Sequence, residues 1–192
     1  MSPAAQAAFL HVLQNPDKGA FSPQEMAESL GYSSMSMSRV FDELESSGLG
    51  RGSSIGKRRL MELVDAKGEL WERALPLLRS PVAESMPVPM NLLGGPAAGL
   101  TALASYTSIA EPRLPVIAVS AATWRPIRNK LVHEQLGGSD VPLVEVEAWI
   151  YPPKAVVGGP VVDRLSLFLS LKGTPDERVE AALDELLAGM KW

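Results

Sequence analysis

The chain has 192 residues, a formal net charge of −4 at pH 7 and no cysteine, and 46% of its residues are hydrophobic. This composition excludes an intrinsically disordered chain, and the lack of cysteine excludes disulfides, thiolate metal sites and thiol catalysis. No apolar run approaches the roughly 20 residues that span a bilayer and no basic segment precedes the apolar stretch at residues 4–13, so we expect a soluble, cytoplasmic protein of one or two domains.

Three helices are expected in the first part of the chain, over residues 2–15, 22–31 and 34–47. Residues that start and stop helices frame them: Ser2, Pro3 and Pro16 for the first, Ser22, Pro23, Glu25 and Gly31 for the second, and Gly48 for the third. The third helix has an apolar stripe at helical spacing, formed by Met37, Val40, Phe41 and Leu44. Two short helices joined by a glycine turn predict a helix-turn-helix.

A basic hairpin is expected after the third helix, with short strands near residues 49–51 and 60–64 and a glycine-rich tip at residues 52–56. The stretch 51–59 carries four basic residues and no acid, namely Arg51, Lys57, Arg58 and Arg59. The net charge of the chain argues against a surface coated in phosphate-binding groups, but a site needs only local charge. A helix over residues 65–79 follows, and Pro76 should bend or shorten it.

Residues 80–95 are expected to be a linker, because four prolines and a glycine pair interrupt the helical pattern around them. In the second domain, residues 96–192, we expect strands at 115–119 and 143–151, helices at 100–109, 123–130 and 175–187, and a capping box of Thr174 and Glu177. Residues 163–171 alternate like a strand, but Asp163 can cap a helix, and we favour a helix. The chain is therefore expected to be α+β, with a helix-turn-helix and hairpin domain over residues 1–79 followed by a small mixed α/β domain.

The order of motifs over residues 37–74 adds a resemblance. A helix containing serine and arginine leads through Gly48 and Leu49 to the basic hairpin, a strand and an entry into the next helix at Lys67 and Gly68. In this order the stretch resembles the winged helix of MarR-type transcription regulators. The resemblance implies a winged helix-turn-helix domain, double-stranded DNA as partner and a role in transcription regulation.

The start of the third helix is the expected base-reading surface. Small hydroxyl side chains let a helix approach base edges closely, and Arg39 can form two hydrogen bonds to guanine. The hairpin would contact the flanking phosphates. The candidate DNA-binding residues are Ser34, Ser36, Ser38, Arg39, Arg51, Lys57, Arg58 and Arg59. Three acids, Asp42, Glu43 and Glu45, lie toward the other end of the helix, which tilts away from a duplex in this docking.

Two alternatives stay open. Residues 99–120 weakly resemble the C-terminal domain of AbiEi-type antitoxins, which implies a nucleotidyltransferase-like toxin as protein partner and autoregulation by DNA binding. The other alternative is a metal-dependent nucleic-acid enzyme using Glu145 and Glu147, two residues apart on a predicted strand, with Asp140, Lys154 and Asp163 in the neighbourhood. Such alternation is typical of any half-exposed strand, so we expect no enzyme, no metal and no cofactor. A homodimer is also considered, and no membrane partner is expected.

Three further features favour a structural interpretation. The glycine-rich stretch 92–99 lacks the lysine and the serine or threonine of a P-loop, so we expect a tight, closely packed turn. A second basic run beside Trp124 is expected to be a solvated face: Arg113, Arg125, Arg128 and Lys130. His11 and His133 have no spacing typical of a metal pair.

Overall fold

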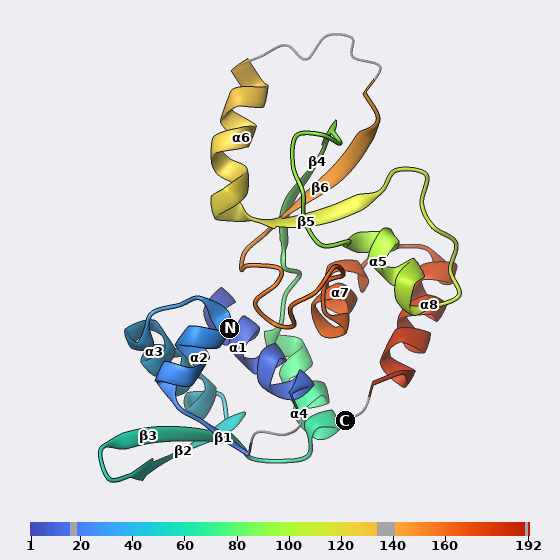
Figure 1. Ribbon diagram of the computed structural model, residues 1–192. Coiled ribbons are helices and arrows are strands. Elements are labelled where there is room, and N and C mark those ends of the chain that lie inside the picture. Colours follow the sequence, from blue (N-terminus) through green and yellow to red (C-terminus); the bar gives the residue numbers. More distant parts are fainter. Residues whose placement is uncertain (16–18, 134–140, 191) are drawn as a thin grey trace. The chain divides into compact units, whose positions relative to one another are not determined.

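The computed structural model describes residues 1–15, 19–133, 141–190 and 192 (Figure 1). Over these residues the protein is α+β, with eight α-helices, one 3₁₀ helix and two three-stranded sheets. The chain divides into two compact units. Unit 1 comprises residues 1–79, 155–157 and 192, and unit 2 comprises residues 80–154 and 158–190.

Unit 1 begins with helices whose ends follow from local sequence. In chain order its elements are α1 (Pro3–Gln14), β1 (Ala20–Phe21), α2 (Pro23–Leu30), α3 (Ser34–Ser46), β2 (Gly50–Ile55), β3 (Arg58–Leu63), α4 (Lys67–Ala74) and the 3₁₀ helix η1 (Leu75–Leu77). The expected capping box of α2 is confirmed, because the Ser22 and Glu25 side chains each accept a hydrogen bond from the other residue's amide. Gly31 then ends α2 in the left-handed region, with φ of 72°, and α3 begins three residues later.

The core of unit 1 lies between α1, α2 and α3. The expected apolar stripe of α3 is confirmed, since Met37, Val40, Phe41 and Leu44 are all buried. They share the interior with large side chains of the other elements, among them Phe9, Leu10, Leu30, Met61 and Trp71. Helix α4 stops before Pro76, which lies in η1, so the expected shortening is also confirmed.

The hairpin is longer than expected. Strands β2 and β3 pair antiparallel from Gly50 with Leu63 to Ile55 with Arg58, and β1 pairs with the other side of β3. The turn holds only Gly56 and Lys57, and Gly56 has φ of 62°, while among the described residues only glycines have a positive φ. A positive φ at the first turn residue alone is the pattern of a type II′ turn. The predicted tip at residues 52–56 was wrong, because cross-strand pairing extends β2 through residues of low strand propensity.

Unit 2 contains a mixed sheet with strand order β4-β6-β5 (Figure 1). In chain order its elements are β4 (Val82–Pro89), α5 (Gly99–Tyr106), β5 (Val116–Ser120), α6 (Ala121–His133), β6 (Leu143–Trp149), α7 (Arg164–Leu171) and α8 (Glu177–Ala188). The central strand β6 pairs antiparallel with β4 and parallel with β5. Asp163 caps α7 by accepting a hydrogen bond from the Ser166 amide, which confirms the helix over residues 163–171.

Two expectations for unit 2 are corrected. Residues 80–95 are not simply a linker, because β4 forms there and pairs with β6 along its length. Pro87 and Pro89 are tolerated since β4 is an edge strand, where a missing amide donor on the outer side removes no ladder hydrogen bond. The cap of α8 is Asp176, whose side chain accepts from the Arg178 amide, and not Thr174.

Helices cover both faces of the sheet of unit 2, with α6 on one side and α5, α7 and α8 on the other (Figure 1). On the α6 side, Trp124 and Leu131 form a buried cluster with apolar residues of the strands, among them Val119, Val144 and Val146. The opposite face of β6 therefore lies under α5 and its neighbours. No helix in the described ranges combines the length and apolar character needed to cross a bilayer.

Candidate nucleic-acid interface

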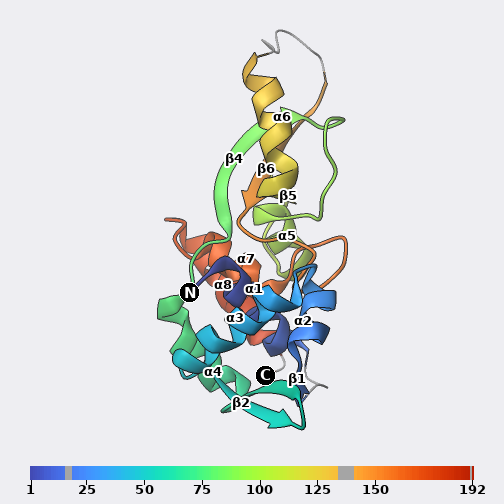
Figure 2. The ribbon, with the colours of Figure 1, turned by 90° about the vertical axis from the view of Figure 1, so that its left-hand side faces the viewer.

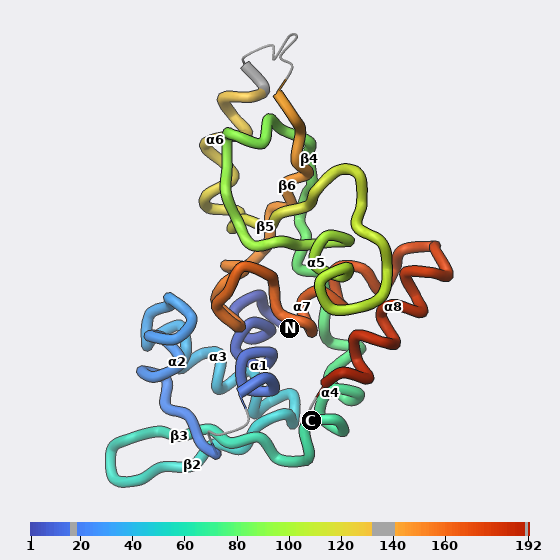
Figure 3. The backbone as a smooth tube through the Cα atoms, turned by 45° about the vertical axis from the view of Figure 1, so that its right-hand side comes forward, coloured from blue at the N-terminus to red at the C-terminus, as the bar shows by residue number. Residues whose placement is uncertain are grey.

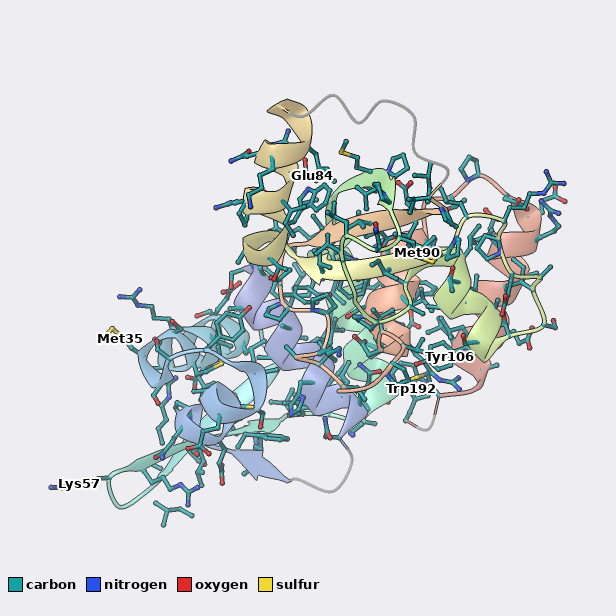
Figure 4. The ribbon with its side chains drawn as sticks, turned by 45° about the horizontal axis from the view of Figure 1, so that its top comes forward. Met35, Lys57, Glu84, Met90, Tyr106 and Trp192 are labelled. Carbon is teal, nitrogen blue, oxygen red and sulfur yellow. The ribbon has the colours of Figure 1, made fainter. Side chains whose placement is uncertain are left out.

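The exposed face of α3 begins with its first turn. Ser34, Met35 and Arg39 are exposed there, opposite the buried stripe of the helix. Figure 4 shows the Met35 side chain projecting away from α3 and the Lys57 side chain projecting from the hairpin tip. A helix face of this kind, with small residues and one cation, has the shape and chemistry that fit a major groove.

The serine hydroxyls of α3 differ in how they are engaged. Ser33 is the cap of the helix, and its hydroxyl shares a hydrogen bond of 2.9 Å with that of Ser36. The Ser38 hydroxyl donates to the Ser34 carbonyl oxygen at 3.0 Å. The Ser34 hydroxyl makes no hydrogen bond to any described residue. Of the three predicted serines, Ser34 is thus the one whose hydroxyl is available to an external partner without rearrangement.

Three of the predicted cations are available as well. Arg39, Arg51 and Lys57 are exposed, and their side chains make no hydrogen bond or ion pair within the described part of the chain. Arg39 lies on α3 and Lys57 on the turn of the hairpin. Arg51 lies near the hairpin base, directly across from Glu62, and so on the sheet face opposite to that of Met61. The structure thus does not place Arg51 beside α3.

Arg59 is held against α3. Its guanidinium forms an ion pair of 2.8 Å with Asp42 and one of 3.5 Å with Glu45, and it donates to the Ser38 carbonyl oxygen at 3.2 Å. It also lies 5.7 Å from the centre of the Phe41 ring, a cation–π distance. Glu45 further accepts a hydrogen bond from the Gly52 amide in β2. These contacts fasten the hairpin to α3 and fix their relative orientation.

Arg58 is held against α2. Its guanidinium donates to Glu25 at 2.8 Å, and Glu25 is the acid of the capping box. The pKa of Glu25 is lowered, first by the hydrogen bonds from the Ser22 amide and hydroxyl and then by Arg58. An exposed pair of this kind contributes about 0.2 to 1 kcal/mol. Arg58 and Arg59 are therefore partly neutralised inside unit 1, whereas Lys57, which precedes them, is not.

The three acids of α3 also have partners inside unit 1. Asp42 and Glu45 pair with Arg59, and Glu43 accepts a hydrogen bond of 2.6 Å from the Ser2 hydroxyl at the start of α1. Negative charge on this helix is thus used to attach the hairpin and α1. The first turns of α3 carry no acid, so Arg39 is the charge that this end presents.

The start of α3 and the hairpin tip lie on the same side of unit 1. Figure 2 looks onto this side, where α3 and the hairpin both face the viewer, and Figure 3 shows the hairpin extending beyond the helices of the unit. We call the exposed first turns of α3 and the turn of the hairpin the α3–hairpin face. Its members are Ser34, Met35, Arg39, Ile55 and Lys57.

Sequence reasoning missed two members of the α3–hairpin face. Met35 is 69% exposed and Ile55 is 71% exposed, which makes them the two most exposed large hydrophobic side chains among the described residues. The signal for Met35 was its position outside the apolar stripe of α3, four residues before Arg39. A correct prediction of the turn at Gly56 and Lys57 would have placed Ile55 next to the tip of the hairpin.

The carboxylate pair predicted in unit 2 does not form an open site. Glu147 is buried, its carboxylate lies close to Gly99 at the start of α5, and it accepts a hydrogen bond of 2.9 Å from the Trp149 indole. Burial raises the pKa of Glu147, while the Trp149 hydrogen bond lowers it and the nearby Glu145 raises it further. The expectation of a half-exposed strand was wrong. Among the described residues no group of three or more potential ligands is arranged to hold a metal, and Asp140 lies outside them.

The raised pKa of Glu147 makes a testable prediction about stability. Between the ordinary carboxyl pKa and the raised one, the folded protein binds more protons than the unfolded chain, so stability falls as pH rises through this window. Glu147→Gln removes that loss and keeps an oxygen for Trp149. We expect the variant to gain stability over the parent as pH rises above about 4.3, the usual Glu pKa.

Urea unfolding at a series of pH values measures this difference. Glu111→Gln, which removes an exposed carboxylate of the same unit, is the matched control and should leave the pH profile unchanged. A Glu147→Gln difference of the same size at every pH would contradict the assignment.

The remaining sequence candidates are structural. The four cations of the second basic run, Arg113, Arg125, Arg128 and Lys130, are all exposed, which confirms the expected solvated face. Trp124 beside them is buried, and Arg128 pairs with Glu84 at 3.3 Å. A Cβ atom at Gly95 would clash with the backbone oxygen of Ala118, which supports the expected closely packed turn. His11 hydrogen-bonds the Val156 carbonyl oxygen at 2.7 Å. His133 closes α6, and nothing is described of its side chain.

Comparison of the chain with protein-family models, with curated proteins and with solved structures gave no match. A proposal for the function therefore rests on the chemistry of the site. Its two parts are a helix face with one available arginine and a tight hairpin turn with one available lysine.

Proposed function

We propose that the chain is a sequence-specific DNA-binding transcription regulator, with unit 1 as a winged helix-turn-helix domain of the MarR-like kind. In this proposal α2 and α3 are the helix-turn-helix, α3 enters the major groove, and the β2–β3 hairpin is the wing. Unit 2 is the regulatory or partner-binding domain. The observation that carries the proposal is the α3–hairpin face, where Arg39 and Lys57 are available cations on a helix start and a hairpin turn.

The order of elements supports the proposal. A helix, a short strand, two helices joined at Gly31, and a hairpin follow one another, and the sheet order β1-β3-β2 places the hairpin at the edge of the unit. A helix seated in the major groove contacts bases with its N-terminal residues, which in α3 are small or basic. The acids of α3 are occupied by Arg59 and Ser2, so they leave the base-reading end uncharged apart from Arg39.

The proposal divides the predicted DNA-binding residues by role. Arg39 reads a base and Lys57 contacts phosphate, whereas Arg58 and Arg59 hold the hairpin on α2 and α3. Ser34 is the serine that can bond a base or phosphate directly. Arg51, near the hairpin base, adds charge to the flank of the site.

Selection of bound duplexes from a random library with the full-length protein tests the proposal. We expect a short consensus sequence and an affinity for it at least about 10³-fold higher than for scrambled duplex of the same length, as specific regulators show. Selection that yields no consensus, or equal affinity for selected and scrambled duplexes, would contradict the proposal.

Lys57→Ala gives a second readout on the same duplexes. Lys57 is expected to neutralise one phosphate, so its loss should weaken selected and scrambled duplexes alike and reduce the slope of log K against log salt by about 1. Binding is measured at several salt concentrations. Lys172→Ala removes an exposed lysine of unit 2 and should change neither affinity nor slope. A loss confined to the selected duplex would show that Lys57 has another role.

A further inference from the structure

Met35 is an unusual residue for an exposed position on a helix start. Its side chain is 69% exposed, although α3 buries another methionine, Met37, completely. A single exposed apolar residue needs no explanation by itself, because protein surfaces contain many of them. Met35 is of interest because it shares its helix face with Arg39. Arg39 lies one turn further along α3 and has no partner among the described residues.

The spacing of these two residues matches that of stacked base pairs. Residues four apart on a helix lie on one face, about 6 Å apart along the axis at 1.5 Å per residue. Base pairs in a duplex are stacked about 3.4 Å apart. Two side chains at this spacing therefore reach base pairs that are neighbours or are separated by one other pair.

The chemistry of Met35 selects among the groups of the major groove. Its flexible thioether side chain adapts to an apolar surface, but it has no strong donor or acceptor for the polar edges of guanine, adenine or cytosine. The apolar group that the major groove offers is the C5-methyl of thymine. We propose that Met35 contacts the C5-methyl group of a thymine that lies within two base pairs of the guanine read by Arg39. This inference rests on the proposed function and adds a specificity-determining residue to it.

The surroundings of Met35 are consistent with this contact. Ser34 precedes it and Ser38 follows one turn later, and both are small enough to let a base edge approach the helix. The Ser38 hydroxyl donates within its own helix, to the Ser34 carbonyl oxygen, so it does not compete for the same base edge. The nearest acids of α3 begin at Asp42, two turns from Met35, and Asp42 is paired with Arg59.

Removal of single methyl groups from the DNA tests the inference. In the duplex selected by the full-length protein, each thymine is replaced in turn by deoxyuridine, which lacks only the C5-methyl. A buried methyl group is worth about 0.8 kcal/mol, so one replacement should weaken binding about fourfold. Met35→Ala should weaken binding to the parent duplex by a similar factor and abolish the effect of that replacement.

Control variants separate this contact from its neighbours. Met35→Leu keeps an apolar side chain and should retain the deoxyuridine effect. Ile55→Ala, which removes the other highly exposed aliphatic side chain, should also retain it. Arg39→Ala should retain it as well, but should abolish the effect of replacing the guanine read by Arg39 with 7-deazaguanine, which lacks the N7 acceptor.

The outcomes distinguish the inference from the proposed function. If the protein selects a duplex but no deoxyuridine replacement weakens binding, or if Met35→Ala leaves the penalty intact, the contact with thymine is wrong while DNA binding stands. The same holds if the sensitive thymine lies more than two base pairs from the guanine. If no duplex is selected, both fail, and Met35 is then a candidate contact for a protein partner.

Discussion

Arg39→Ala is expected to weaken binding to the selected duplex by roughly 5- to 150-fold, or about 1 to 3 kcal/mol, and to leave binding to scrambled duplex nearly unchanged. The reason is that a bidentate contact with guanine exists only where the correct base is present. Arg39 is exposed and has no partner among the described residues, so its removal breaks no internal contact that would change the fold. Equilibrium binding to both duplexes at one salt concentration measures the effect.

Two variants make the Arg39 experiment specific. Arg125→Ala removes an exposed arginine of unit 2 and should change neither affinity. Arg39→Lys keeps the charge but not the planar fork, so it should leave binding to scrambled duplex unchanged and retain only part of the preference for the selected one. Equal losses on both duplexes for Arg39→Ala would assign Arg39 to phosphate contact and leave base reading without its arginine.

Phe41→Ala is expected to destabilise unit 1 by about 3 to 5 kcal/mol, the usual result of removing a buried aromatic ring. Phe41 is 1% exposed and belongs to the stripe that fixes α3 to the core. Its ring also lies beneath the Arg59 guanidinium, so the substitution removes a cation–π contact that helps attach the hairpin. Both losses act on the α3–hairpin face, and we expect DNA affinity to fall as unit 1 unfolds.

Amide hydrogen exchange, followed separately on peptides of each unit, measures the effect of Phe41→Ala. Protection should fall in α1, α2 and α3 and persist in the sheet of unit 2, because the two units have separate cores. Phe41→Leu, which leaves a smaller cavity, should lose less protection. Unchanged exchange in α3 would contradict the role of Phe41 in holding that helix.

The helices of unit 1 could be predicted because their signals are local. The Ser22 and Glu25 capping box and the glycine at position 31 act within a few residues of one another, and the structure has each as expected. The apolar stripe of α3 is equally local, since helical spacing alone brings its members to one face. The helix caps and the apolar stripe can therefore be predicted from the sequence without knowledge of the tertiary contacts.

The hairpin and β4 could not be predicted well because their formation depends on distant partners. Gly52 and the two serines after it have low strand propensity, and only pairing with β3 makes them part of β2. The prolines of β4 argue against a strand in the sequence, and the partner strand β6 begins more than fifty residues later in the chain. Strand formation at such positions is a property of the assembled sheet.

The candidate site was predictable in its residue types but not in their contacts. Lys57, Arg58 and Arg59 are consecutive and read alike in the sequence, yet only Lys57 has no partner among the described residues. The pairing of Arg59 with Asp42 joins β3 to α3 across 16 intervening positions, which depends on how the hairpin packs. The burial of Glu147 likewise involves a distant part of the chain, since Gly99 at the start of α5 lies close to its carboxylate.

The prolines of β4 also limit self-association. The Met90 amide donates to the carbonyl oxygen of Pro142, the residue just before β6. Successive backbone amides of a strand point to opposite sides, so the nitrogens of Pro87 and Pro89 point to the outer edge of the sheet. No described strand pairs with that edge. A strand arriving from a second molecule would find two successive donors missing, which disfavours growth of the sheet into a fibril at high protein concentration.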